Sequence, residues 1–132
     1  MTLLPVTLAA AAAAAVLNIW LSLRIGAVRQ AAGISIGDGG SDALHRRMRA
    51  QMNFVENTPF VLALIIAIEL SDKGGLWLPI VAGIYFLARI AHGIGMDGGT
   101  WAKGRMIGTI VTMLTQLGLA AAAVLIVLKV IQ

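Results

Sequence analysis

Cysteine is absent from the sequence, which excludes disulfides, thiolate metal ligands and a cysteine nucleophile. Any thiol chemistry therefore requires a thiol that a substrate brings. Charged residues are also scarce, at 12% of the chain, whereas hydrophobic residues make up 59%. Ordinary soluble domains contain about 25% charged residues, so a membrane is a better solvent to assume than water. The length of 132 residues suits a single domain.

A continuous basic stripe is also lacking, although the formal net charge is +4. The ten basic residues are split among apolar stretches, whereas a phosphate backbone needs them gathered on one exposed surface. We therefore expect no nucleic-acid partner.

Four apolar stretches predict an all-α, integral membrane four-helix bundle. Residues 3–23 and 106–128 contain no charged residue, and each stretch can cross a hydrocarbon core of about 30 Å at about 1.5 Å per residue. Residues 57–68 and 74–88 are uncharged but too short to span alone, so their helices must extend through polar residues. We predict one domain over residues 1–132, with helices over about 3–31, 42–71, 75–97 and 101–130.

The boundaries of these helices carry turn and capping residues. Glycines at 33, 37, 39 and 40 predict a flexible connection, after which Ser41 or Asp42 could cap the second helix. Glu69 falls at the outer rim of that helix. The first apolar stretch could instead be a signal peptide, but it lacks a positive n-region and continues through Asn18 without a convincing cleavage site.

The basic residues are distributed unequally between the two predicted membrane faces. Lys73 and Lys129 lie toward one face, and the other eight lie toward the opposite face. By the positive-inside rule, the eight mark the cytoplasmic side and both termini lie outside. The same asymmetry also fits an anionic ligand site. The eight are Arg24, Arg29, Arg46, Arg47, Arg49, Arg89, Lys103 and Arg105.

Polar residues form stripes on the two middle helices. Arg49, Asn53 and Glu56 are spaced i, i+4 and i+7, which places them on one helix face within about 10 Å of axial rise. The third helix carries Arg89 and His92 at a similar depth. A carboxylate inside a membrane is costly, so Glu56 should face protein or a water-filled cavity and pair with a cation.

Arg105 opens the last helix at nearly the same depth as these stripes. Arginines from several helices around one carboxylate suit a ligand that carries carboxylates and a free amine. The structural alternative is that the arginines snorkel to lipid phosphates and that Glu56 and Arg49 form an ion pair within the bundle. His45 and His92 show no metal-ligand spacing, so we predict no metal site.

Residues 49–59, which read R-A-Q-M-N-F-V-E-N-T-P, resemble the signature of the MAPEG family of membrane-associated proteins in eicosanoid and glutathione metabolism. That signature reads Arg-Ala-x-x-Asn-x-x-Glu and is followed shortly by a proline. The run from Arg89 to His92 resembles a third-helix motif of the same family. The resemblance covers essentially the whole chain. It implies a homotrimer in a bacterial inner membrane, with glutathione bound between subunits near the cytoplasmic face.

The resemblance also implies roles for individual residues. Arg105 matches the arginine that favours the glutathione thiolate, since a nearby cation lowers a thiol pKa from about 8.5. The family's eicosanoid-forming members have tyrosine at the position of Met96, and serine and tyrosine at the positions of Met106 and Thr109, so the resemblance is broken at these three residues. The residues that would hold glutathione are Arg29, Arg49, Gln51, Asn53, Glu56, Arg89 and His92.

These departures favour a glutathione transferase or peroxidase that acts on hydrophobic electrophiles from the lipid, rather than a dedicated eicosanoid synthase. Two alternatives stay open. One is a non-catalytic scaffold that binds glutathione or lipid. The other is a small multidrug-type transporter, since four short helices around a membrane carboxylate also describe proton-coupled exporters. Against the transporter, arginines near Glu56 would repel a cationic substrate.

Overall fold

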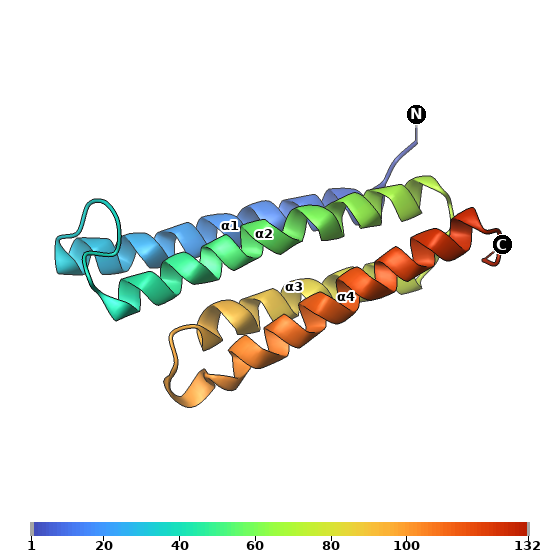
Figure 1. Cartoon of the computed structure of the whole chain (residues 1–132). Helices are drawn as coiled ribbons and strands as arrows, with labels where there is room; N and C mark the ends of the chain where they lie inside the picture. The colour runs from blue at the N-terminus through green and yellow to red at the C-terminus, as the bar shows by residue number, and fades with distance from the viewer. Residues whose placement is uncertain (1, 132) are drawn as a thin grey trace.

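The computed structural model describes residues 2–131, and this part of the chain folds into four long α-helices without a β-strand (Figure 1). A short 3-10 turn, η1, precedes the last helix. The helices are α1 (Pro5–Ala32), α2 (Asp42–Leu70), α3 (Trp77–Gly95) and α4 (Lys103–Val127), with η1 at Gly99–Trp101. The helix ends differ from the predicted ranges by at most three residues.

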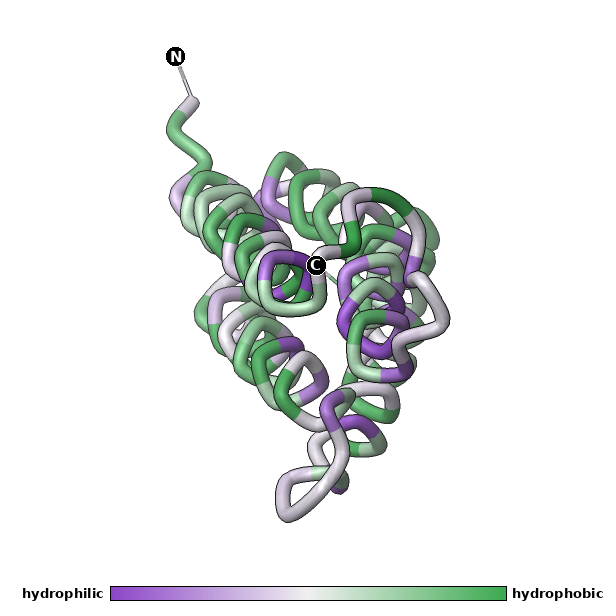
Figure 2. The backbone as a smooth tube through the Cα atoms, turned by 90° about the vertical axis from the view of Figure 1, so that its left-hand side faces the viewer, coloured by the Kyte–Doolittle hydropathy of each residue, from purple (hydrophilic) through white to green (hydrophobic). Residues whose placement is uncertain are grey.

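All four helices are long and apolar enough to cross a membrane. Hydrophobic residues lie along all four helices, as the view along the bundle in Figure 2 shows. Phe60, Leu87 and Leu114 are each at least 64% exposed, where a soluble bundle would carry polar side chains. The prediction of an all-α, membrane-spanning four-helix bundle is confirmed.

The helix ends follow from local chemistry. The Ser41 hydroxyl accepts a hydrogen bond from the Leu44 amide at 3.2 Å, so Ser41 rather than Asp42 caps α2. Gly33 ends α1 with a left-handed φ of 68°, and its amide donates to the Arg29 carbonyl. The loops at 33–41 and 96–102 both lie at one end of the bundle, opposite the start of α1 and the end of α4 (Figure 1).

Glu69 has a structural role beyond marking the rim of α2. Its carboxylate accepts hydrogen bonds from the backbone amides of Val6 at 2.9 Å and Thr7 at 2.7 Å. α1 has no capping side chain of its own at Leu4, so Glu69 satisfies its first amides from another helix. This contact joins the beginning of α1 to the end of α2.

The core lies along a continuous face of α2, where Phe54, Val61 and Ile65 are buried against the other helices. Tyr85 of α3 is fully buried, and its hydroxyl hydrogen-bonds to the Thr58 hydroxyl at 2.8 Å. α3 packs most closely against α4, and α1 packs most closely against α2.

Candidate functional site

A polar groove of about 390 Å³ opens between α2, α3 and α4 near the loop end of the bundle. We call it the arginine groove. Four of the eight predicted site residues line it: Arg49, Asn53, His92 and Arg105. The other lining residues are Asp42, His45, Arg46, Met96 and Thr109.

Glycines of α4 allow the groove to form. A Cβ atom on Gly108 would lie 2.3 Å from the Cβ of His92 and 2.7 Å from the Ala88 carbonyl oxygen. A Cβ atom on Gly104 would lie 2.3 Å from the Ala91 carbonyl oxygen. Only glycine permits this approach, which brings Arg105 beside the groove. Neither glycine was predicted from the sequence, although their i, i+4 spacing is a known signal of close helix contact in membranes.

Arg89 lies beneath the groove and does not line it. Its side chain is buried, with 2% of its surface exposed. One terminal nitrogen, Nη2, donates to Asn53 Oδ1 at 2.8 Å, and the other, Nη1, donates to Thr112 Oγ1 at 3.0 Å. Nη2 also lies 3.4 Å from His92 Nδ1. Arg89 therefore contacts two groove residues from behind.

Glu56 lies on the exposed side of α2. Its carboxylate is 3.8 Å from Arg49 Nη1, and the two side chains are 50% and 48% exposed. The sequence predicted a cation beside Glu56, and Arg49 is that cation. However, neither side chain is enclosed within one chain, so the pair lies on the outer surface of a helix that can span a membrane.

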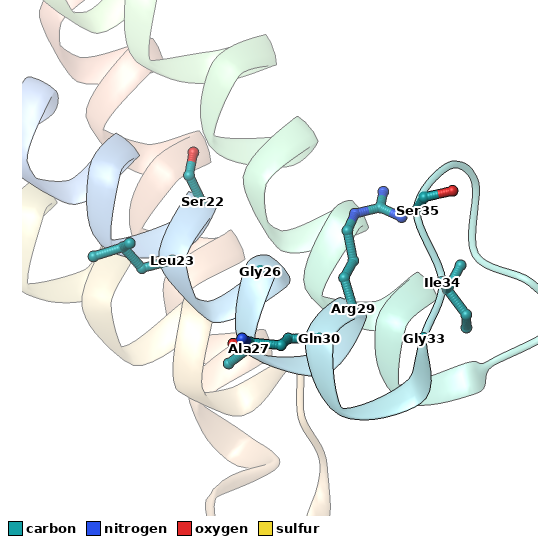
Figure 3. A pocket seen from close by; sticks show the side chains of 9 residues that line it. All are labelled: Ser22, Leu23, Gly26, Ala27, Arg29, Gln30, Gly33, Ile34 and Ser35. Carbon is teal, nitrogen blue, oxygen red and sulfur yellow. The ribbon is translucent and has the colours of Figure 1, made fainter.

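Arg29 and Gln51 lie away from the arginine groove. Arg29 Nη1 donates to the Gly37 carbonyl at 2.7 Å, and Arg29 lines an open hollow of about 730 Å³ on the outer side of α1 (Figure 3). Gln51 Nε2 donates to Ser22 Oγ at 2.6 Å. Both residues also line a hollow of about 430 Å³ between α1 and α2. Within one chain, the predicted glutathione residues are thus divided between two sides of α2.

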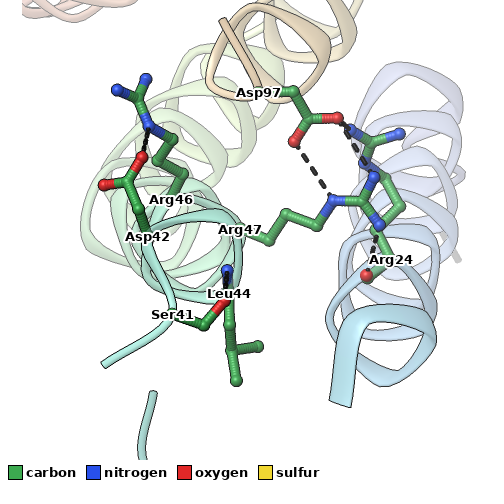
Figure 4. A network of polar contacts seen from close by, with 7 residues as sticks. All are labelled: Arg24, Ser41, Asp42, Leu44, Arg46, Arg47 and Asp97. Atoms are coloured by element: carbon green, nitrogen blue, oxygen red, sulfur yellow. Dashed lines mark hydrogen bonds and ion pairs between the residues drawn. The ribbon is translucent and has the colours of Figure 1, made fainter. Parts of the chain in front are cut away.

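An ion-pair network joins α1 and α2 to the segment after α3 at the loop end of the bundle (Figure 4). Asp97 pairs with Arg24 and accepts two hydrogen bonds from Arg47, at 3.2 Å each. Arg47 also donates to the Arg24 carbonyl at 2.7 Å. Partial burial opposes ionisation of Asp97, but the hydrogen bond from Arg47 and the charge of Arg24 outweigh it and hold the pKa of Asp97 below its ordinary value.

Two departures from the motif of the eicosanoid-forming members line the groove. The Thr109 hydroxyl donates to the Arg105 carbonyl at 2.9 Å, so its proton is used within α4. Met96 offers only a thioether. Within residues 2–131, no group of three or more His, Asp or Glu side chains is placed to hold a metal ion.

The fold and the groove define a polytopic α-helical membrane protein with a cationic pocket between its helices. The model of the MAPEG family matches residues 7–125. The chain therefore belongs to the MAPEG family, which includes glutathione transferases and related proteins. No curated protein matches the chain.

Proposed function

We propose that this protein is a membrane-bound glutathione transferase that joins the thiolate of glutathione to lipophilic electrophiles. The observation that carries the proposal is the arginine groove, where Arg49, Asn53, His92 and Arg105 meet from three helices. Guanidinium groups bind carboxylates through paired hydrogen bonds, and glutathione has two carboxylates. Membership of the MAPEG family supports this choice of ligand.

The chemistry needs no nucleophile from the protein. The Arg105 guanidinium would stabilise the thiolate, and the thiol proton would pass to water. The sulfur then forms a bond to an electrophilic carbon, and the leaving group departs with the bonding electrons. With an electrophile that undergoes addition, the electron pair of the π bond that breaks moves onto a neighbouring atom of the electrophile, which water then protonates. Catalysis comes from holding the thiolate and from raising its fraction at neutral pH.

The proposal includes a homotrimer whose sites lie between subunits. Two observations support it. The Arg49–Glu56 pair is half exposed on a helix that can span a membrane, and charges in lipid need cover from protein. Arg49 and Gln51 also point in directions about 200° apart on α2, and they line different hollows of one chain. A neighbouring chain that offers Arg29 and Gln51 to the arginine groove would complete the predicted set.

We place the arginine groove on the cytoplasmic side of a bacterial inner membrane, with both termini outside. The excess of basic residues at the loop end supports this orientation. Cytoplasmic glutathione would then reach the groove from water, while hydrophobic electrophiles would approach through the lipid.

A non-catalytic scaffold is the second candidate, and one observation favours it. The Thr109 hydroxyl is bonded to the Arg105 carbonyl, so the groove lacks a free hydroxyl donor at this position. The transporter alternative is weaker, because Glu56 is paired with Arg49 at 3.8 Å and a cationic substrate would be repelled there. Turnover of an electrophile separates the transferase from the scaffold.

The test is calorimetric titration of glutathione into purified protein in detergent at fixed salt. Wild type should bind at millimolar glutathione or below. Arg49→Ala and Glu56→Gln should each weaken binding about tenfold or more, because each removes a charge-assisted hydrogen bond. Lys103→Ala is the matched control, since it removes a positive charge near the start of α4 from a residue that does not line the groove.

Conjugation of chlorodinitrobenzene, followed by absorbance, then tests turnover. Binding together with conjugation supports the transferase. Binding without conjugation supports the scaffold. No wild-type binding at millimolar glutathione would overturn the proposed function.

A further inference from the structure

Arg89 is a buried cation without an acidic partner. It is 2% exposed, and none of the ion pairs among residues 2–131 includes it. Its hydrogen-bond partners are the side chains of Asn53, Thr112 and His92, none of which is acidic, and its Nε atom has no partner. Its guanidinium also lies 5.9 Å from the centre of the Phe54 ring, but burying a charge without an opposite charge remains costly. Packing alone therefore does not explain why an arginine occupies this buried position.

The guanidinium determines which end of the Asn53 amide faces the groove. Guanidinium nitrogens only donate hydrogen bonds, so the Asn53 atom that lies 2.8 Å from Arg89 Nη2 must be the oxygen Oδ1. The other end of the amide is Nδ2, which is a donor. Since Asn53 lines the arginine groove, the groove receives a donor from this residue.

Arg89 constrains the His92 ring in the same way. Its Nδ1 lies 3.4 Å from Arg89 Nη2, and because the arginine donates, Nδ1 must accept and carries no proton. The ring proton is then on Nε2. His92 also lines the groove, so a side chain that could donate or accept becomes a donor toward it.

We propose that Arg89 is a positioning residue that turns Asn53 and His92 into hydrogen-bond donors toward a carboxylate in the arginine groove. This inference rests on the proposed function and replaces a direct contact between Arg89 and glutathione. Together with Arg49 and Arg105, the two donors favour an anionic ligand with hydrogen-bond acceptors. They disfavour a ligand that presents hydrogen-bond donors. The one acidic lining residue, Asp42, is paired with Arg46 at 2.7 Å. The carboxylate of the ligand supplies the negative charge that Arg89 lacks.

The first test measures the His92 tautomer in the wild type without ligand. Long-range proton–nitrogen correlation spectra of ¹⁵N-histidine-labelled protein in micelles show which ring nitrogen is protonated, and the His45→Gln variant assigns the two histidines. We expect His92 to be protonated on Nε2 alone. A proton on Nδ1, whether in the other tautomer or in the imidazolium, would overturn the inference.

Variants then test whether Arg89 is the cause. Arg89→Met should give a mixture of His92 tautomers and weaken glutathione binding about tenfold, as expected for losing oriented hydrogen bonds. Arg89→Gln replaces the donor-only guanidinium with an amide that can donate or accept, so it should also mix the tautomers and serves if the methionine variant does not fold. Thr112→Val is the matched control, because it removes a bond to Arg89 on the side away from the groove; it should leave the tautomer unchanged.

The two readouts separate this inference from the proposed function. Wild-type protein that has the Nε2 tautomer but binds no glutathione would overturn the proposed function and support the positioning role. Glutathione binding with unchanged tautomer and affinity in both Arg89 variants would overturn the positioning role alone.

Discussion

Arg105 is the residue whose removal should affect the thiol chemistry most directly. It lines the groove beside His92 and Asn53, and its guanidinium would stabilise the glutathione thiolate. In Arg105→Ala, the pKa of the bound thiol should rise toward its ordinary value of about 8.5, and conjugation at neutral pH should fall about tenfold for each pKa unit regained. Thiolate absorbance measured against pH in the bound complex checks this. An unchanged thiol pKa would remove Arg105 from the catalytic role.

Asp97 should contribute to stability in a pH-dependent way. Its pKa is held below the ordinary value of 3.8 by Arg47 and Arg24 against the opposing effect of burial. A depressed carboxyl pKa stabilises the fold above the unfolded pKa, and this stabilisation is lost as pH falls through the folded pKa. Asp97→Asn should therefore lower the thermal midpoint at neutral pH, with the difference from wild type shrinking once pH falls below 3.8.

The magnitude for Asp97→Asn should be modest. Asp97 is 35% exposed, so water screens the pair, and we expect about 1 kcal/mol, which is below the usual range for hydrogen bonds to charged groups. Asp42→Asn is a useful comparison, since its partner Arg46 lies on the same helix and its side chain is 80% exposed. A larger loss of stability from Asp42→Asn than from Asp97→Asn would contradict the role of the Asp97 network in holding the helices together.

At the scale of the helices, the contact between α3 and α4 controls the shape of the groove. A Cβ atom on Gly108 would lie 2.3 Å from His92 Cβ and 2.7 Å from a backbone oxygen. Gly108→Ala should push α4 away from α3, destabilise the protein by about 1–3 kcal/mol through overpacking, and weaken glutathione binding by moving Arg105. Thermal unfolding and calorimetry measure the two effects.

Gly118 provides the control on the same helix. Nothing lies within 4 Å of a Cβ atom built there, so Gly118→Ala should leave binding unchanged and should not destabilise, because alanine favours a helix more than glycine does. Equal behaviour of the two alanine variants would contradict the packing explanation.

The helices could be predicted from the sequence because membrane spans depend on local composition. Uncharged runs of sufficient length and glycine-rich connections are visible in neighbouring residues, and so is the stripe of Arg49 and Asn53. Contacts between distant segments have no such local signal. Arg24 and Asp97 are 73 residues apart, and Glu69 reaches amides 62 and 63 residues away, so neither contact could be derived from spacing. The burial of Arg89 beneath the groove likewise depends on how α3 packs.

At the scale of the whole molecule, the separation of Arg29 and Gln51 from the arginine groove tests the proposed homotrimer. If one chain supplies Arg29 and Gln51 and its neighbour supplies Arg49, Asn53, His92 and Arg105, then a site damaged in one half can be completed by another chain. The Arg29→Ala/Gln51→Ala double variant and Arg105→Ala should each be nearly inactive alone.

Co-expression of these two variants with different affinity tags should restore activity in doubly purified oligomers. A cyclic trimer that contains both variants has one of its three interfaces with two undamaged halves, so conjugation should recover to about a third of wild type. Lipid-embedded cross-linking of the same sample should give trimers. If both halves of the site instead belonged to one chain, every chain in the mixture would carry a damaged site, and mixing would restore nothing. Recovery therefore distinguishes a site shared between subunits from one that a single chain completes.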